Sequence, residues 1–379
     1  MPNETLRNAQ VAKKDEFYTQ LVDIEKELKY YKQHFQGKVV LCNCDDPYES
    51  NFFKYFALNF NALGLKKLIA TCYNGSPIAG DELPLLFEIE EKEPKKIAYK
   101  VEITEVSDYN GDGAINLTDV QYLIQNDKNV LSLLKENGDF RSNECIELLK
   151  EADIVVTNPP FSLFREYLAQ LVRYEKQFLI IGNQNAITYK EVFPSIQNNL
   201  MWLGATGFVT DMVFGVPEGT IVKESDKVKA ERLGYVGNYT RLGNSCWYSN
   251  VDHGRRHLPL KLMTMNENFK HSKHKDIRGR KDYIHYENYD AIEVPYTDAI
   301  PSDFNGIMGV PKSFVDKYCP EQFEIIGIAE GDSGKELGLK PYPPELKKLN
   351  PSLRHGQLYY MEDGYPIKPF ARILIRKKQ

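Results

Sequence analysis

Four consecutive residues, Asn158-Pro159-Pro160-Phe161, carry the clearest chemical signal in this chain of 379 residues. They follow an apolar run that begins at Asp153, and they precede apolar positions at helical spacing from Ser162 to about Val172. This pattern predicts a strand, a tight turn and a helix. Because ligands of open α/β sheets bind at the carboxyl ends of the strands, we expect the turn to present hydrogen-bond acceptors to a ligand.

Methylation of an exocyclic amine is a reaction that needs such acceptors. The lone pair of an adenine amino nitrogen is delocalised into the ring, so the group must be held and aimed at a methyl donor. The Asn158 side-chain oxygen and the Pro159 carbonyl can each accept one amino proton, and proline has no N–H that competes for them. Phe161 would then lie against a base that has left the duplex stack. The alternative is an ordinary turn that only ends the strand.

The composition is typical of a soluble globular protein with room for two domains, at 42% hydrophobic residues and a net charge of −5. No apolar run reaches the length of a membrane span, and the first residues lack a basic start followed by an apolar core. The six cysteines include no C-x-x-C pair, which argues against a zinc ribbon or a disulfide framework. We therefore expect a cytoplasmic protein without membrane contact.

Apolar runs alternate with helical segments, which predicts an α/β fold with a doubly wound, mostly parallel sheet. The expected strands are Val39–Cys42, Lys67–Cys72, residues 153–157 and Phe178–Ile181, and a helix is expected at Asn51–Leu63. An insertion at residues 80–135 contains an expected β-hairpin, with arms at 85–89 and 97–103. After about residue 215 the pattern changes to Gly, Pro, Tyr and short strands. We expect a catalytic domain at residues 1–215 and an α+β domain at 216–379.

The turn after the first strand has the polar groups that a methyl donor with a ribose, an adenine and a methionine zwitterion requires. Asp45 and Asp46 suit the ammonium or the ribose hydroxyls. The candidate residues of this turn are Asn43, Asp45, Asp46 and Tyr48. The alternative is a turn that only caps the next helix, through Ser50 or Asn51.

Two further segments are candidates for the donor site. Asp139 and Phe140 combine an acid with an aromatic ring, and they precede Asn158 in an order that suits contact with the donor's adenine. Near the N-terminus, Phe17, Tyr18 and Thr19 precede a helix with one apolar stripe. The two aromatic rings either pack under the donor or form a hydrophobic staple at the start of that helix.

The order Asp-Glu-Phe-Tyr-Thr, Cys-Asp-Asp-Pro, Gly-Asp-Phe and Asn-Pro-Pro-Phe resembles the adenine-specific DNA methyltransferases of the EcoRI modification-enzyme family. The resemblance covers most of the chain and extends through Trp247-Tyr248, Asp252–Arg256, Tyr286–Ile292, Gly309–Phe314 and Arg372–Arg376. It implies a Rossmann-like catalytic core, S-adenosyl-L-methionine as donor and the N6 amine of adenine in double-stranded DNA as target. It also implies a C-terminal target-recognition region, and a restriction-modification role with a separate cognate restriction endonuclease.

The chain departs from the general methyltransferase pattern in two places. The first turn lacks the glycine-rich F-x-G-x-G, and Ala70–Asn74, at the end of the second strand, has no acid to hold the ribose. Asp45 is then the residue expected to bind the ribose. The assignment of Asn158 is unaffected.

The net charge of −5 requires that any DNA contact come from a local basic surface. One segment fits, with six basic residues and one acid: Lys270, Lys273, Lys275, Arg278, Arg280 and Lys281, with Asp276. It could follow phosphates, while the flanking Tyr283, Tyr286 and Tyr289 offer rings for stacking. The alternative is a solvated loop, as most charge runs are.

Residues 108–119 match a twelve-residue calcium loop and resemble the loops of dockerin-type modules. The expected ligands are Asp108, Asn110, Asp112, Ala114 and Asp119, with Gly113 at the sharp turn. No helix is expected before the loop, so a full EF-hand is not predicted. The motif predicts a structural Ca²⁺ in the insertion, and the alternative is a turn whose acids remain solvated.

Other functions compete with DNA methylation. The same turn can grip an RNA adenine or a protein glutamine, and a DNA-binding protein with an inactive site would keep much of this sequence. The C-terminal half is large and rich in Arg, Lys and Tyr, as duplex binding requires. The sequence therefore favours a site-specific DNA adenine methyltransferase.

Overall fold

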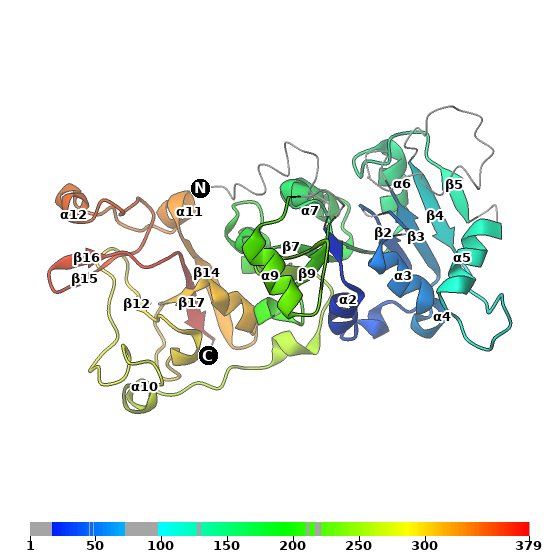
Figure 1. Ribbon diagram of the computed structural model, residues 1–379. Helices are drawn as coiled ribbons and strands as arrows, with labels where there is room; N and C mark the ends of the chain where they lie inside the picture. The colour runs from blue at the N-terminus through cyan, green and yellow to red at the C-terminus, as the bar shows by residue number, and fades with distance from the viewer. Residues whose placement is uncertain are drawn as a thin grey trace. The chain divides into compact units, whose positions relative to one another are not determined.

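The computed structural model describes residues 17–44, 46–47, 49–72, 98–126, 130–209, 212–216 and 221–378. The chain divides into two compact units (Figure 1). Unit 1 is Met1–Gln184 with Leu203–Asp252, and unit 2 is Asn185–Trp202 with His253–Gln379. This division differs from the boundary expected at residue 215, because residues 216–252 belong to unit 1. Within the described residues, no helix is long and apolar enough to cross a membrane.

An eight-stranded sheet with the order β5-β4-β3-β2-β6-β7-β11-β8 forms the centre of unit 1. The strands are β2 Val39–Cys42, β3 Lys67–Thr71, β4 Tyr99–Ile103, β5 Leu131–Leu133, β6 Ile154–Thr157, β7 Gln177–Asn183, β8 Trp202–Leu203 and β11 Ser245–Ser249. The four central strands β3, β2, β6 and β7 are parallel, and β4, β5 and β11 add antiparallel pairs beside them. The expected α/β fold with a parallel centre is confirmed. The second arm of the expected hairpin is β4, and the first arm lies outside the described residues.

Helices cover both faces of this sheet. They are α2 Leu21–Leu28, α3 Asn51–Leu58, α4 Phe60–Leu63, α5 Leu117–Asn126, α6 Asn143–Glu151 and α7 Phe164–Arg173. Helices α2, α3 and α5 share one core cluster with Val40 and Val156 of the strands. On the other face, the Phe164 ring of α7 lies so close to Gly182 that a Cβ there would meet it at 2.4 Å. The apolar stripe predicted for residues 162–172 therefore packs against the sheet.

Polar contacts fix both ends of the first strand-helix unit. Asp153, just before β6, accepts a hydrogen bond from the Val39 backbone N–H at 2.8 Å, which sets β6 beside β2. The Ser50 side chain caps α3 by accepting from the Phe53 N–H at 3.3 Å. The expected helix at 51–63 is interrupted at Asn59, whose φ and ψ of −102° and 11° separate α3 from α4.

A buried carboxylate anchors α2 within unit 1. Glu27 is fully buried, and its two oxygens accept from the Ala205 N–H at 2.6 Å, the Thr206 N–H at 2.8 Å and hydroxyl at 2.5 Å, and the Tyr31 hydroxyl at 2.8 Å. A Cβ on Gly204 would lie 2.4 Å from Glu27 Oε1, so the close approach requires glycine. The carboxylate thus joins α2 to the segment after β8.

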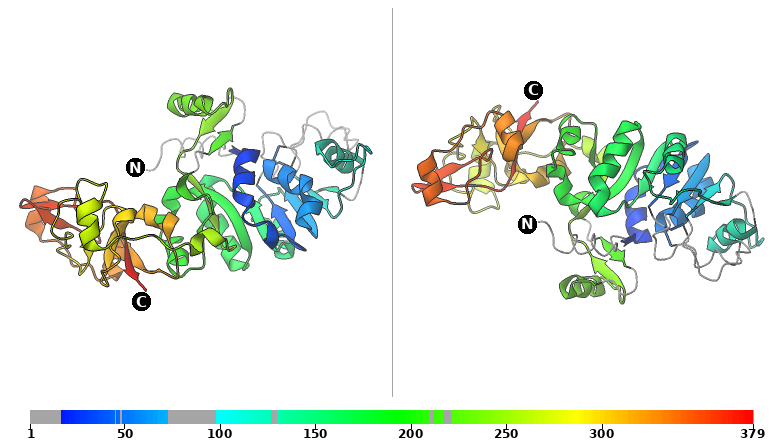
Figure 2. Two further views of the ribbon diagram at one scale, coloured as in Figure 1. Left: turned by 90° about the horizontal axis from the view of Figure 1, so that it is seen from below. Right: turned by 90° about the horizontal axis from the view of Figure 1, so that it is seen from above.

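A smaller three-stranded sheet has the order β1-β9-β10, with β1 Tyr18–Thr19, β9 Val213–Gly215 and β10 Tyr239–Arg241. Both outer strands run antiparallel to β9, and α9 Glu224–Arg232 packs on β10. In Figure 2, α9 projects away from the large sheet of unit 1, whereas Phe214 of β9 belongs to the same core cluster as that sheet. The β1–β9 pairing brings the chain near the N-terminus together with residues around Phe214.

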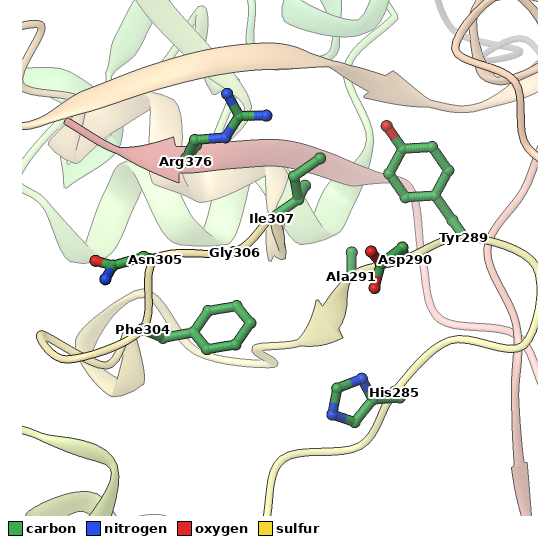
Figure 3. Close-up of a pocket in the computed structure, with 9 residues that line it drawn as sticks. All are labelled: His285, Tyr289, Asp290, Ala291, Phe304, Asn305, Gly306, Ile307 and Arg376. Carbon is green, nitrogen blue, oxygen red and sulfur yellow. The ribbon is translucent and has the colours of Figure 1, made fainter. Parts of the chain in front are cut away.

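Unit 2 contains a four-stranded sheet with the order β12-β13-β17-β14 and a hairpin of β15 and β16. Its elements are α8 Phe193–Gln197, α10 Met265–His271, β12 Ile292–Glu293, β13 Met308–Pro311, β14 Phe323–Ala329, α11 Gly331–Glu336, α12 Pro344–Leu349, β15 Tyr360–Glu362, β16 Tyr365–Ile367 and β17 Arg372–Lys377. A buried ion pair joins Arg372 Nη2 to Glu293 Oε1 at 2.6 Å. Unit 2 also contains a cavity of about 500 Å³ (Figure 3).

Candidate active site

The turn after β6 holds a buried acceptor that no group of the described residues satisfies. Asn158 is 6% exposed, and its Nδ2 donates to the Phe17 carbonyl at 2.6 Å. This bond fixes the amide so that Oδ1 is the free end, and that buried oxygen has no hydrogen-bond partner among the described residues. An unpaired buried polar group costs about 1–3 kcal/mol, so its presence calls for a functional explanation. The turn therefore has an acceptor available to a ligand N–H.

Three phenylalanine rings stand beside this turn. Phe161 lies 5.7 Å from Phe17 and 6.3 Å from Phe214, and Phe17 lies 6.1 Å from Phe214, measured between ring centroids. Phe161 is only partly buried and packs at the margin of the core. The sequence prediction named Phe17 and Phe161 but missed Phe214, which lies in the short strand β9 without a motif around it. These three rings form the aromatic cluster of the site.

The turn after β2 is joined directly to the turn after β6. Asn43 is buried, its carbonyl accepts from the Thr157 hydroxyl, and its Oδ1 accepts from the Tyr167 hydroxyl of α7. Cys44 has a φ of 79°, a left-handed conformation that non-glycine residues rarely adopt. The glycine-rich pattern that the sequence lacks is thus replaced by a strained cysteine at the same turn, as is common at functional sites.

The other residues predicted in the turn after β2 have different positions: Asp46 is buried, and Ser50 caps the next helix. Asp46 is 2% exposed and accepts from the Tyr99 hydroxyl at 2.7 Å. Ser50 is the N-cap of α3, so the capping alternative is confirmed for that residue. Asp45 and Tyr48 lie outside the described residues.

The N-terminal segment contributes a second unsatisfied group. Asn51 Nδ2 donates to the Thr19 carbonyl at 2.8 Å, which ties β1 to the start of α3. The Thr19 hydroxyl oxygen is buried and has no hydrogen-bond partner among the described residues. Tyr18 is partly buried in β1. Segment 17–19 therefore contacts both the Asn158 turn and the helix that follows the first turn.

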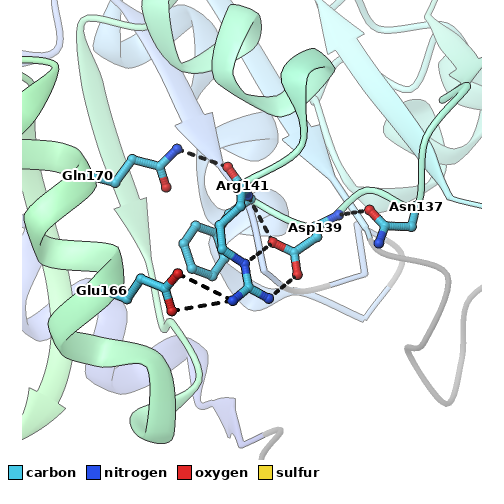
Figure 4. A network of polar contacts seen from close by, with 6 residues as sticks. Asn137, Asp139, Arg141, Glu166 and Gln170 are labelled. Atoms are coloured by element: carbon cyan, nitrogen blue, oxygen red, sulfur yellow. Dashed lines mark hydrogen bonds and ion pairs between the residues drawn. The ribbon is translucent and has the colours of Figure 1, made fainter.

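Asp139 lies in a polar network with helix α7 (Figure 4). Arg141 donates to Asp139 from Nε at 2.8 Å and from Nη2 at 2.6 Å, and its Nη1 donates to Glu166 at 3.3 Å. The hydrogen bonds from Arg141 lower the pKa of Asp139 and so stabilise the ionised carboxylate. Arg141 was not predicted from the sequence, although it follows the Gly-Asp-Phe motif directly.

Phe140 is held against the same helix. Its ring meets Tyr167 edge-on at 5.0 Å, and its carbonyl accepts from Gln170 Nε2 at 3.0 Å. Because Tyr167 also bonds Asn43, one helix contacts both turns that the sequence proposed for the donor. Tyr167 entered the sequence analysis only as part of the helix.

The calcium prediction receives no support. The Asp108 carboxylate accepts from the backbone N–H groups of residues 111, 112 and 113, and Asp119 accepts from those of residues 109, 110 and 116. Within the parts of the chain that are described, no group of three or more His, Cys, Asp or Glu residues could hold a metal ion. The predicted ligands Asp108, Asn110, Asp112, Ala114 and Asp119 instead shape a turn closed by its own N–H groups.

The basic segment Lys270–Lys281 lies in unit 2, and its predicted DNA-binding residues are exposed or half-buried. Lys273 Nζ pairs with Asp298 at 2.8 Å, and Arg280 Nη2 lies 3.5 Å from Glu362. The expectation that Tyr283 and Tyr286 are available for stacking is wrong. Both rings are buried, and their hydroxyls bond within the unit, to the Ala299 carbonyl and to Glu293.

Comparisons with known proteins identify relatives along almost the whole chain. The family described as "Adenine-specific methyltransferase EcoRI" matches residues 5–378. The chain is 43% identical to the Type II methyltransferase M.EcoRI of Escherichia coli over 92% of its own length and 96% of the relative. It is 34% identical to the Type II methyltransferase M.MpnI of Mycoplasma pneumoniae over 98% and 97%, respectively. No solved structure matches the chain.

Proposed function

The chain belongs to the EcoRI family of adenine-specific methyltransferases, and we propose that it methylates the N6 amine of an adenine flipped out of a specific sequence in duplex DNA. Its family makes it an adenine-specific DNA methyltransferase that takes its methyl group from S-adenosyl-L-methionine. What the proposal adds is the role of each residue in the site.

The buried, unpartnered Asn158 Oδ1 is the observation that carries the proposal. With Nδ2 tied to Phe17, Oδ1 accepts one proton of the adenine amine, and the Pro159 carbonyl accepts the other. Holding both protons frees the nitrogen lone pair and aims it, so the turn acts by orientation and electrostatics. Phe161, supported by Phe17 and Phe214, lies against the flipped base, and Pro160 keeps the turn stiff.

The donor supplies an electrophilic methyl group on a sulfonium. The residues that we assign to it are Phe17, Tyr18, Thr19, Asn43, Asp45, Asp46, Tyr48, Asp139 and Phe140. Two observations favour their fit to a polar ligand. The Thr19 hydroxyl is buried without a partner, and the left-handed Cys44 turns the backbone at the end of β2, where ligands of open sheets bind. Asp139, whose ionised form Arg141 stabilises, is suited to accept from the amino group of the donor's adenine.

We assign target recognition to the C-terminal region, residues 216–379. The exposed basic residues between Lys270 and Lys281 would follow the phosphates of double-stranded DNA. Methylation of one site protects it from a separate cognate endonuclease, so we place the enzyme in a restriction-modification system. A DNA substrate also agrees with the expected cytoplasmic location.

The proposal is tested with purified protein, labelled S-adenosylmethionine and separate pools of duplex DNA, RNA and protein. We expect label in DNA alone, as N6-methyladenine in one sequence context identified by sequencing. Label in RNA or protein without label in DNA would favour the alternative substrates. No transfer together with normal donor binding would mean that the site is not a catalyst.

A further inference from the structure

Unit 2 contains a cavity of about 500 Å³ that the reaction assigned above does not use. Three segments distant in sequence line it: His285 to Ala291, Phe304 to Ile307, and Arg376 in β17 (Figure 3). In this view Tyr289 and Phe304 lie on opposite sides of the lining, Arg376 lies above and His285 below, and Asp290 lies beside Ala291. The wall is therefore mixed, with two aromatic rings and several groups that form hydrogen bonds.

The polar side chains of this wall are not used to hold the unit together. Among the described residues, the side chains of His285, Asp290 and Asn305 make no hydrogen bond or ion pair with protein. Arg376 makes one long ion pair, 3.7 Å from Nη1 to Glu324, between side chains that are 47% and 54% exposed. Such an exposed pair contributes little and leaves most guanidinium N–H groups available. The donors and acceptors of the wall are free to bind a ligand.

Gly306 shapes the aromatic side of the cavity. A Cβ on Gly306 would lie 2.6 Å from the Phe304 ring, so glycine lets this ring rest against the backbone. A methyl group at residue 306 would therefore push the Phe304 ring out of its position in the wall. The substitution Gly306→Ala thus moves one ring without changing the charge of the cavity.

The chemistry of the wall fits a nucleobase better than a phosphate or a metal ion. The Asp290 carboxylate would repel a phosphate, and one carboxylate with one guanidinium does not form a cation site. Guanidinium N–H groups match the O6 and N7 acceptors of a purine, and a carboxylate or amide oxygen matches an exocyclic amine. Aromatic rings supply the stacking surface that an exposed base needs.

We propose that this cavity takes one nucleobase of the substrate DNA and thereby contributes to sequence selection. The inference rests on the proposed function, since it needs DNA as the substrate. Arg376 and Asp290 read the base edge, and Tyr289 and Phe304 contact its face. The cavity is thus a specificity site, separate in sequence from the Asn158 turn.

The test measures kcat/KM on a duplex carrying the methylated sequence and on duplexes with each base pair replaced in turn. We compare the wild type with Arg376→Lys, Arg376→Gln, Asp290→Asn and Gly306→Ala, and use Lys347→Gln, at an exposed lysine of α12, as the control. The first three variants should lose roughly 10-fold or more on the correct duplex and discriminate less at one base pair. Gly306→Ala should act in the same direction. Donor affinity should be unchanged in all of them.

Arg376→Lys is the decisive variant, because it keeps the charge and loses the fork-shaped set of donors. If Arg376 only contacts a phosphate, lysine will behave like the wild type, and glutamine will weaken all sequences uniformly with a salt slope lower by about 1. That pattern, or unchanged discrimination in every variant, would overturn the cavity proposal while DNA methylation by the wild type stands. A wild-type protein that methylates no DNA would instead overturn the proposed function and this inference together.

Discussion

At the scale of single residues, the site depends on one amide whose two ends have different tasks. Asn158 Nδ2 donates a hydrogen bond to the Phe17 carbonyl, so the orientation of the Asn158 amide is fixed before any substrate binds. Oδ1 remains the only side-chain acceptor that this amide can offer. An acceptor held in place in this way needs no reorganisation during the reaction, which is where electrostatic catalysis gains most.

Asn158→Ala should reduce kcat for adenine methylation by about 10²-fold or more, the usual loss when one well-placed catalytic hydrogen bond is removed. Affinity for S-adenosylmethionine should remain within a few-fold, because Asn158 is assigned to the target amine. Methyl transfer in single turnovers and donor titration measure the two quantities. Asn126→Ala, at the exposed end of α5, is the control. Retained activity in Asn158→Ala would rule out the amine-gripping role.

Phe161→Ala should weaken capture of the flipped adenine, with a loss of roughly 1–3 kcal/mol in DNA binding or kcat/KM, the usual contribution of one stacked base. Phe161→Trp should retain part of the activity, because its larger ring can still lie on the base and on Phe17. Fluorescence of a duplex with 2-aminopurine at the target position reports the flipped base directly. Equal flipping by wild type and Phe161→Ala would refute the stacking role.

The elements that position Asn158 and Phe161 were predictable, because β6 and α7 adjoin the motif in the sequence. The roles of the two residues stay predictions. Phe214 and Tyr99 were missed because strand pairing brings them to the site from distant parts of the chain. Phe214 lies opposite Thr19 in the β1–β9 pair, and the Tyr99 hydroxyl bonds Asp46, 53 positions away. Tyr283 and Tyr286, after the basic segment, were misjudged, since their rings are buried and their hydroxyls bond to groups inside unit 2.

At the scale of elements, α7 connects the catalytic turn to both turns proposed for the donor. It begins just after Phe161, and Tyr167 on its inner face contacts Asn43 and Phe140. Glu166 and Gln170 contact the loop around Arg141 from the same helix. One helix therefore links the Asn158 turn to the residues that we propose for donor binding.

Tyr167→Phe should raise KM for S-adenosylmethionine several-fold with a smaller effect on kcat, because the lost hydroxyl releases Asn43 but leaves the Asn158 turn unchanged. The free energy of unfolding should fall by about 1 kcal/mol, as for one net hydrogen bond. Tyr30→Phe, at an exposed tyrosine just after α2, is the matched control. A donor affinity equal to that of the wild type would show that Tyr167 is only structural.

Glu27→Gln tests the anchor of α2. In the glutamine variant an NH₂ group replaces one carboxylate oxygen and faces an N–H group of Ala205 or Thr206 that donates to Glu27 in the wild type. We therefore expect a loss on the order of 2–3 kcal/mol in the free energy of unfolding. Glu25→Gln on the exposed side of the same helix should be neutral. Denaturant unfolding followed by circular dichroism measures both. A loss equal to that of the control would mean that the buried carboxylate contributes nothing.

The strands of the parallel centre were predictable because each is a short apolar run followed by a polar turn. The strand order of the whole sheet was not predictable, because β4 and β5 of the insertion and β11, at residues 245–249, extend the sheet at its two sides. The twelve-residue loop illustrates the limit of a local pattern. Its acids have the spacing of calcium ligands, but backbone N–H groups of the loop itself satisfy them.

At the scale of the whole molecule, a net charge of −5 means that DNA attraction comes from a restricted surface. Two of the predicted contacts are already partly neutralised, by the Lys273–Asp298 and Arg280–Glu362 pairs. Lys270, Lys275, Arg278 and Lys281 are exposed and, among the described residues, form no ion pair. They are therefore the residues of this segment best able to displace counterions from phosphates.

Replacing Lys275 and Arg278 together by glutamine should lower the slope of log K against log salt by roughly 0.9 for each lost phosphate contact. Affinity should fall uniformly across sequences, because phosphate contacts carry no base information. Fluorescence anisotropy at several salt concentrations gives the slope, and a double Lys347→Gln, Lys348→Gln variant in α12 removes the same charge elsewhere in unit 2. If both doubles change the slope equally, net charge rather than this segment governs binding. If neither does, the segment is a solvated loop and the phosphates are bound by other residues.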